Sequence, residues 1–332
     1  MNKNNSFELF TPPHILSGMS LDTPILLGLS GGADSVTLLH MLVGYCRGTG
    51  APLYTAHVNH MIRGEDAERD RDFCEALAAE YGVPCFVLEA DVPAAAKERG
   101  IGLEEAARQM RYDFFDGLML RHSIPLLATA HNADDALETL IFNISRGCGL
   151  QGLGSIPPVR QFGGGLLIRP LLKAPKADIL RYCEQNSLSF VTDATNADDT
   201  YSRNHIRHNI IPALKKLNGA VLKNTARLSE SARLDADFMA RQVNSYLEGN
   251  DPMSLSSLRA LHPALLTRVL ARLYSDYSGG LSVEQVHLSA LITLIERGVG
   301  NSALSLPGLI RAQIRSGRLE FVPDPRKSFR HL

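Results

Sequence analysis

The feature that most constrains the fold is a regular alternation of short apolar runs with longer amphipathic segments between Pro24 and about Asp193. This alternation is typical of βαβ units that build a parallel sheet flanked by helices, an α/β fold. The expected strands are Ile25–Leu29, Pro52–Val58, Pro84–Ala90 and Ile124–Ala130, and the expected helices are Ser35–Tyr45, Asp66–Tyr81, Leu103–Leu120 and Asp134–Arg146. Because the carboxyl ends of such strands line the ligand crevice, we expect the chemistry at that edge of the sheet.

The length of 332 residues favours two domains. The segment Gly147–Gly165 is rich in glycine and proline and predicts a loop. A long helical pattern follows over Gly219–Leu247, and the tail Ser302–Pro323 has the alternation and turn residues of a small hairpin. We therefore expect an α/β domain over residues 1–218 and a smaller, mainly helical domain with a terminal hairpin over 219–332.

Composition excludes several classes of protein. The formal net charge of −1 gives no cationic field over the whole molecule, so any site for a polyanion must be local. The cysteines are odd in number and contain no C-x-x-C pair, which argues against a zinc ribbon, an iron–sulfur cluster or a disulfide scaffold. Reduced thiols, an N-terminus without an apolar leader and the lack of a long apolar run predict a cytoplasmic protein with no membrane span.

A glycine-rich turn joins the first expected strand to its helix, with the sequence Ser30-Gly31-Gly32-Ala33-Asp34-Ser35. Glycines let the backbone approach a phosphate, and the free N–H groups at a helix start favour an anion. Asp34 cannot bind phosphate itself, so its carboxylate suggests a divalent cation between it and the phosphates. The alternative is an ordinary capped turn of an α/β protein.

The same turn lacks the ending of a Walker A loop and the G-x-G-x-x-G of a dinucleotide fold. It resembles the loop of the PP-loop ATP pyrophosphatases, which split ATP between its α and β phosphates and transfer AMP to an acceptor. That resemblance implies ATP as a substrate, Mg²⁺ as its metal and ATP contacts from Ser30–Ser35.

Further motifs indicate which molecule accepts AMP. They are His57–Gly64, Glu105–Tyr112, Ala128–Thr139, Arg169–Leu172, Asp193–Asn196 and Arg203–Arg207. Over about residues 24–215 this series resembles the tRNA(Ile)-lysidine synthetase family in the order and spacing of its motifs. The resemblance implies ligation of free L-lysine to C2 of the wobble cytidine in the CAU anticodon of tRNA(Ile). The reaction would pass through an adenylated cytidine, release AMP and diphosphate, and change codon reading from AUG to AUA.

Three carboxylates follow the fourth expected strand. Asp134 and Glu138 are four residues apart and share a helical face, and Asp135 adjoins it. Such a cluster can bind Mg²⁺, receive an ammonium group or accept its proton, whereas an acidic first turn that complements the helix dipole is the alternative. The resemblance favours Asp135 and Glu138 for the substrate lysine, and Asp34 with Asp134 for Mg²⁺.

Arg108 and Arg111 lie on one helical face. Surface ion pairing is one alternative, and neutralisation of charge on the transferred α-phosphate, favoured for Arg111, is the other. His57 and His131 are expected ATP contacts, although His131 could equally be a histidine satisfied in the crevice wall. The family commonly has a second histidine where this chain has Asn132. The expected catalytic residues are Asp34, Arg111, Asp135 and Glu138.

The segment between residues 203 and 233 is locally basic, because it contains seven Lys and Arg residues and only one acidic residue. Such a segment suits RNA phosphates, although a solvated helix face is the alternative. The expected tRNA contacts are Arg203, Asn204, Arg207, Lys215 and Lys216. The chain looks like the short form of the family, with one C-terminal domain. Recognition of tRNA would then use fewer contacts or a second subunit, as in a homodimer.

Two other functions compete with lysidine formation. A tRNA cytidine 2-thiolation enzyme targets the same ring position, but its relatives use cysteine pairs that this chain lacks. A non-catalytic module could hold a nucleotide or RNA, but it would not need the carboxylates at Asp34, Asp134, Asp135 and Glu138.

Overall fold

The computed structural model describes residues 9–59, 65–191, 201–249, 251–298 and 302–324. The chain divides into two compact units, residues 1–232 and 233–332. The division lies within the long helix α11 (Val221–Leu247), whereas the expected boundary precedes that helix. The first turn of α11 belongs with the first unit because Val221 and Leu222 pack against the buried side chains of Ile206 and Ile211.

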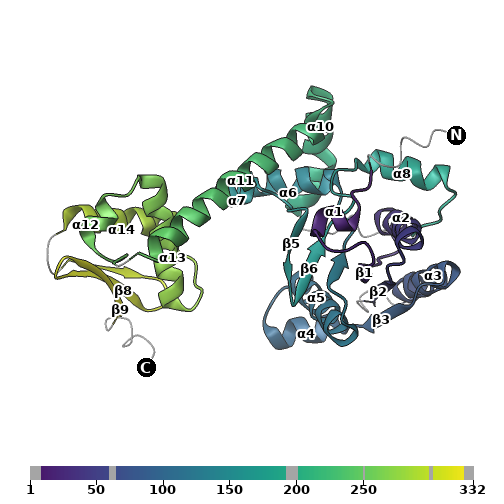
Figure 1. Cartoon of the computed structure of the whole chain (residues 1–332), viewed down its shortest axis with the longest axis horizontal. Helices are drawn as coiled ribbons and strands as arrows, with labels where there is room; N and C mark the ends of the chain where they lie inside the picture. Colours follow the sequence, from purple (N-terminus) through teal and green to yellow (C-terminus); the bar gives the residue numbers. More distant parts are fainter. Residues whose placement is uncertain (1–8, 60–64, 192–200, 250, 299–301, 325–332) are drawn as a thin grey trace. The chain divides into compact units, whose positions relative to one another are not determined.

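The first unit is built on a six-stranded sheet with the strand order β3-β2-β1-β4-β6-β5 (Figure 1). Its strands are β1 (Ile25–Gly28), β2 (Leu53–Asn59), β3 (Cys85–Glu89), β4 (Leu126–Ala128), β5 (Val159–Phe162) and β6 (Gly165–Ile168). Neighbouring strands pair in parallel, except that β5 pairs antiparallel with β6 at the edge. The predicted α/β class and the four predicted strands are confirmed.

Helices cover both faces of this sheet. On one face, Ile25 and Leu27 of β1 share a buried core with α2 (Ala33–Thr49), α3 (Glu65–Tyr81) and α8 (Lys176–Gln185). On the other face, Leu26 of β1 packs with α5 (Leu103–His122), beside α4 (Val92–Arg99) (Figure 1). Successive strand residues point to opposite faces, so a strand buried on both faces reads as a continuous apolar run. A short helix α1 (Pro13–Ser17) precedes the sheet.

The prediction of a loop over Gly147–Gly165 is wrong. This segment contains a short helix, α7 (Leu150–Leu153), and the strand β5, which forms a hairpin with β6. The turn of the hairpin uses Gly163 with a φ of +51°, a conformation that costs glycine little. A four-residue edge strand has no clear period of its own, and its ladder with β6 supplies the hydrogen bonds that a loop would take from water.

The remaining helices of the first unit follow β4 and α8. They are α6 (Ala133–Ser145), α9 (Tyr201–His205), the π-helical turn η2 (Ile206–Ile210) and α10 (Ile211–Leu217). Leu137 of α6 packs against Ile206 of η2 and Ile211 of α10. Helix α6 therefore lies against the basic segment that runs from α9 to α10. The widened turn precedes Pro212, which has no N–H to donate to the preceding turn.

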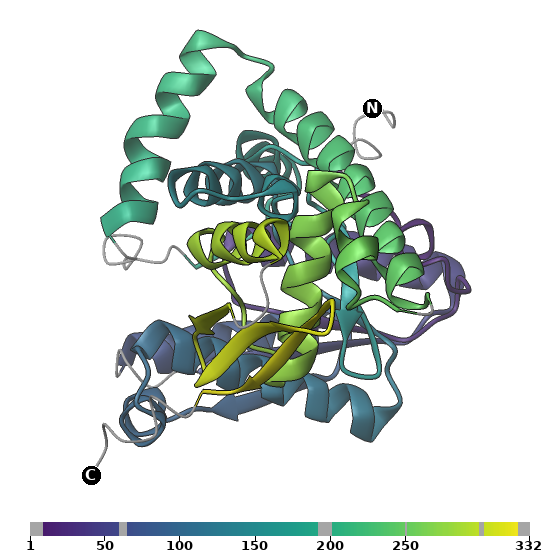
Figure 2. The same ribbon diagram turned by 90° about the vertical axis from the view of Figure 1, so that its left-hand side faces the viewer.

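The second unit has its own core. It contains α12 (Leu255–Arg259), α13 (Pro263–Ser278), α14 (Gln285–Arg297) and a sheet of β7 (Ala303–Leu306), β8 (Ile310–Arg315) and β9 (Arg318–Pro323). Figure 2 shows this sheet in yellow with helices of the same unit beside it. Alternate residues of β8, Ile310, Ala312 and Ile314, are buried against Leu291 of α14. The expected hairpin is present as β8–β9, and β7 extends it to three strands.

None of the helices in the described part of the chain is long and apolar enough to cross a membrane. All five cysteines, which lie in described segments, are free thiols.

Candidate active site

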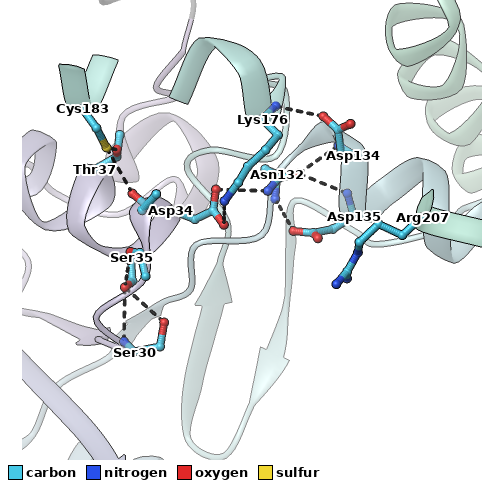
Figure 3. Close-up of polar contacts among 12 residues, drawn as sticks. Ser30, Asp34, Ser35, Thr37, Asn132, Asp134, Asp135, Lys176, Cys183 and Arg207 are labelled. Carbon is cyan, nitrogen blue, oxygen red and sulfur yellow. Dashed lines mark hydrogen bonds and ion pairs between the residues drawn. The ribbon is translucent and has the colours of Figure 1, made fainter. Parts of the chain in front are cut away.

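The glycine-rich loop turns directly from β1 into α2, as predicted. Gly31 has a φ of +83°, and a Cβ at this position would lie 3.3 Å from the Cys74 sulfur, so both the backbone conformation and the space favour glycine. The Ser35 hydroxyl accepts hydrogen bonds from the backbone N (3.2 Å) and Oγ (3.1 Å) of Ser30, and it donates to the Gly32 carbonyl (3.0 Å) (Figure 3). No side chain caps α2 at Gly32. The loop therefore presents the free N–H groups of a helix start to an anion.

Asn132 joins this loop to α6. Its Oδ1 accepts hydrogen bonds from the backbone N–H groups of Asp134 (2.9 Å) and Asp135 (3.1 Å), while its Nδ2 donates to Oδ1 of Asp34 (3.2 Å) (Figure 3). Asp135 completes the capping box by accepting from the Asn132 backbone N–H at 2.9 Å. An amide both donates and accepts, so one buried side chain caps α6 and holds the Asp34 carboxylate beside it.

Two lysines neutralise the carboxylates expected to bind the metal. The Lys176 ammonium donates to Oδ2 of Asp34 at 2.7 Å, and the Lys176 backbone N–H donates to Oδ2 of Asp134 at 2.8 Å. The Lys215 ammonium pairs with Oδ1 of Asp134. Asp34 and Asp134 are thus gathered around the first residue of α8, and cationic groups already contact both.

Glu138 lies buried in α6, with 4% of its surface exposed, and faces arginines of the basic segment. Its Oε2 accepts from Nε (3.0 Å) and an Nη (2.8 Å) of Arg207, while Oε1 lies 3.7 Å from an Nη of Arg203. A buried carboxylate requires such compensation. Arg203 and Arg207 therefore hold the acidic helix in this structure, and their expected role in tRNA binding stays a prediction.

Burial raises the pKa of Asp135 to about 6, and the nearby carboxylates of Asp34 and Glu138 raise it further against the lowering effects of its hydrogen bond from Asn132 and of Arg207. A carboxyl group with such a pKa changes its protonation state near neutral pH. Asp135 is therefore the member of the cluster best suited to take up a proton and release it.

Burial lowers the pKa of both expected histidines. His57 is buried and its Nδ1 contacts the carbonyl of Leu29, just before the loop, at 2.9 Å; burial lowers its pKa. His131 lies against the Thr129 hydroxyl at 3.0 Å, and burial lowers its pKa to about 3. His57 thus supports the backbone of the loop. Direct ATP contacts from either histidine stay predictions.

The other expected residues are dispersed. Burial lowers the pKa of Arg111, which lies on α5 beside Arg108 rather than with the carboxylates. Lys216 is exposed on α10, and Asn204 has a buried side-chain oxygen without a hydrogen-bond partner. Residues 60–64 of one motif and the whole of the motif Asp193–Asn196 lie outside the described residues.

Sequence reasoning missed Lys176. Lys176 belongs to none of the motifs, and a lysine at the first position of a helix usually faces solvent. The packing of α8 beside α2 brings it to Asp34. It also gave no role to Arg160 or to Arg169, although Arg169 begins one of the named motifs.

The fold and the loop define a PP-loop protein. The family model described as a PP-loop domain matches residues 8–214. Among solved structures, the U34-tRNA thiolase of Methanococcus maripaludis shares this fold with a TM-score of 0.55 and 20% identity, covering 63% of this chain and 72% of that chain.

Curated relatives show to which family of PP-loop proteins the chain belongs. The tRNA(Ile)-lysidine synthase of Bacillus subtilis is 34% identical over 295 residues, which cover 85% of this chain and 62% of the relative. The same enzyme of Oceanobacillus iheyensis is 32% identical over 324 residues, which cover 93% and 69%. The chain belongs to the tRNA(Ile)-lysidine synthase family, and it spans a little under two thirds of the length of the Bacillus subtilis relative.

Proposed function

We propose that this chain ligates L-lysine to C2 of the wobble cytidine in the CAU anticodon of tRNA(Ile). In the first step the cytidine O2 attacks the α-phosphate of ATP, and diphosphate leaves. In the second step the ε-ammonium of lysine gives up a proton and the resulting amine attacks C2. The C2–O bond breaks, AMP leaves, and the nitrogen loses a second proton to solvent. The product, lysidine, changes codon reading from AUG to AUA and amino-acid identity from Met to Ile.

One observation carries the proposal beyond family membership. Asn132 binds Asp34 of the phosphate loop and also caps the helix that carries Asp135 and Glu138. The loop that would hold ATP is therefore fixed beside the carboxylates that would hold an amine. This juxtaposition supports a reaction between a nucleotide-activated carbon and an amine that the carboxylates bind as its ammonium ion and then deprotonate.

Glu138 and Asp135 are suited to different roles toward the substrate lysine. Oε2 of Glu138 is occupied by Arg207, whereas Oε1 has Arg203 only at 3.7 Å, so Oε1 is the oxygen we assign to the substrate ammonium. Asp135, with a pKa of about 6, is ionised at neutral pH and is assigned as the acceptor of the proton that the substrate ammonium loses before its nitrogen attacks.

The donor set around Asp34 and Asp134 fits Mg²⁺ bound mainly through nucleotide phosphates. Magnesium in such sites takes one or two carboxylates and completes its shell with phosphates and waters. Asp34 and Asp134 would hold the ion, which would neutralise phosphate charge. Lys176 and Lys215 would then give up their present partners.

Of the competing functions, thiolation has the least support in this chain. The five free cysteines are spread over α2, α3, β3, α8 and the segment before α7, and no described group of them could hold a cluster. A non-catalytic nucleotide- or RNA-binding module is separated from the enzyme by the experiment below.

The proposal is tested by incorporation of labelled lysine into an isoleucine tRNA with a CAU anticodon, in the presence of ATP and Mg²⁺. Label on this tRNA, and none on a methionine tRNA with the same anticodon, is the expected result. Asp34→Ala should abolish AMP formation while circular dichroism shows an intact fold. AMP release with another acceptor would discard lysine, and no AMP with any acceptor would favour the binding module. Sedimentation of the purified chain tests the predicted homodimer.

A further inference from the structure

Four arginines lie at the carboxyl edge of the sheet, close enough to His131 for the charge of each to lower its pKa. Arg108, Arg111 and Arg160 surround the ring of Tyr112, with their guanidinium carbons 5.2, 5.7 and 5.5 Å from its centre. Arg108 and Arg111 come from the first half of α5, whereas Arg160 comes from β5, the edge strand that the sequence did not reveal. Two separate elements therefore deliver positive charge to one aromatic side chain.

Arg169 adds a buried charge to the group. Only 6% of its surface is exposed, one Nη donates to the carbonyl of Pro157, and its Nε has no hydrogen-bond partner. Burial lowers the pKa of Arg169 to about 10; Tyr112 acts against this shift, whereas Arg160 and Arg108 lower the pKa further. A guanidinium that is buried, unsatisfied and close to like charges is costly unless an anion completes it.

No carboxylate within the described segments forms an ion pair with any of these four arginines. The basic residues first expected to bind tRNA behave differently, because Arg203, Arg207 and Lys215 all contact acidic side chains of α6. The four arginines and Tyr112 are here called the arginine cluster. Within the described part of the first unit, no carboxylate neutralises the positive charge of the arginine cluster, so an anionic ligand could do so.

The arginine cluster lies on the opposite face of the sheet from the phosphate loop. The C-terminus of α5 leads into β4, so the N-terminal half of α5, with Arg108 and Arg111, reaches the carboxyl edge. That helix packs on the face formed by Leu26, whereas α2 packs on the face formed by Leu27 (Figure 1). The loop and the start of α2 already provide for the phosphates of a nucleotide, so the cluster is available to a different phosphate.

We propose that Arg108, Arg111, Arg160 and Arg169 form a binding site for a backbone phosphate of the RNA acceptor, beside the aromatic ring of Tyr112. The site rests on the proposed function, because it places the RNA on the α5 face of the crevice and ATP on the α2 face. Guanidinium groups bind phosphate oxygens through paired hydrogen bonds, and a ring beside them can stack on an exposed base.

The test compares Arg108→Gln/Arg160→Gln with the matched control Arg121→Gln, an exposed arginine in the last turn of the same helix. Arg111 is left unchanged because the sequence predicts for it a contact with the α-phosphate of ATP, a competing assignment that would confound the ATP control. Arg169 is left unchanged because it is buried. Binding of an isoleucine tRNA with a CAU anticodon is measured by filter binding at several salt concentrations, and binding of ATP is measured by equilibrium dialysis. Circular dichroism checks the fold of each variant.

We expect the double variant to bind the tRNA about tenfold or more weakly. The slope of log affinity against log salt should fall by about 0.7 for each phosphate that the variant no longer binds, the value for single strands. ATP affinity, and the behaviour of Arg121→Gln, should match the wild type.

Three results would overturn this assignment. Weakened ATP binding with unchanged tRNA binding would assign the cluster to the nucleotide phosphates instead. Unchanged binding of both would leave it without a phosphate ligand. An equal loss of tRNA affinity in Arg121→Gln would show that the effect comes from the net charge of the protein and not from a site at the arginine cluster. Failure of the proposed function looks different, because the wild type would then bind this tRNA while transferring no lysine to it.

Discussion

Asn132 shows how much one side chain can organise. A histidine at this position could not accept two backbone N–H groups and at the same time donate to Asp34 with the same geometry, because its ring offers one acceptor nitrogen when neutral. The amide does both, and it is 3% exposed, so water does not compete for these bonds. The amide of Asn132 therefore links the loop to α6 through the hydrogen bonds of a single side chain.

We predict that Asn132→Ala lowers the free energy of unfolding by about 1–3 kcal/mol, because α6 loses its cap and Asp34 loses a buried donor. Asn132→Ser is the matched variant, since serine retains a cap acceptor and should recover part of the loss. Denaturant unfolding of the three proteins measures both effects. Equal stability of the alanine variant and the wild type would contradict the assigned role of the cap.

Asp135 gives a prediction with a defined pH dependence. Its folded pKa of about 6 lies above the ordinary value of 3.8, so the folded state binds its proton more tightly than the unfolded state does. The stability that this group contributes is complete below about pH 4 and is lost as the pH rises to about 6. Asp135→Asn should therefore stabilise the protein by up to about 3 kcal/mol at pH 8, and by less at pH 4.5.

Unfolding in denaturant at these two pH values checks the prediction. Asparagine retains an oxygen to accept from the backbone N–H of Asn132, so the capping box serves as its own control. A stability difference that is the same at both pH values would show that the Asp135 proton is not held more tightly in the folded protein.

At the scale of elements, α6 and the basic segment from α9 to α10 hold each other by charge as well as by packing. Two nitrogens of Arg207 donate to one oxygen of Glu138, and Lys215 contacts Asp134. Leu137 of α6 packs against Ile206 of the basic segment. The sequence placed acidic and basic residues in separate motifs with separate ligands. The fold pairs them, because α6 and the segment after residue 200 lie against each other.

We predict that Arg207→Met lowers the free energy of unfolding by about 2 kcal/mol, because the buried Glu138 carboxylate loses its main partner. The figure lies below the loss expected for a fully buried pair because Arg207 itself is partly exposed. Adding Glu138→Gln to this variant removes the unpaired charge and should restore most of the loss. A double variant no more stable than Arg207→Met would mean that packing, and not charge, dominates this contact. The measurement is a double-mutant cycle in denaturant.

At the scale of the whole molecule, each unit has a hydrophobic core of its own. Leu127 in β4 and Leu291 in α14 are both fully buried, one in each unit. Because unfolding of a chain with two cores need not be a single transition, scanning calorimetry should resolve two. Leu291→Ala should lower the melting temperature of one transition and Leu127→Ala that of the other, with a loss of about 2–5 kcal/mol in each unit. A single transition shifted equally by both substitutions would contradict this independence.

The sequence by itself determined the parallel sheet, the position of the phosphate loop and the identity of the carboxylates. These follow from local patterns: apolar runs with a fixed period, glycines at a turn, and acidic residues at the start of a helix. Even the order of elements from β1 to α6 could be predicted, because neighbouring parts of the chain decide it.

Only the tertiary structure decided which charges meet. Lys176 reaches Asp34, Arg207 reaches Glu138, and Arg160 joins Arg108 through an edge strand that looked like a loop. These pairs join residues that are distant in the chain, and a charged residue in a sequence looks the same whether it faces water, a carboxylate or a phosphate. Their partners are fixed by the packing of helices and strands around a shared core, because packing alone determines which side chains leave water together.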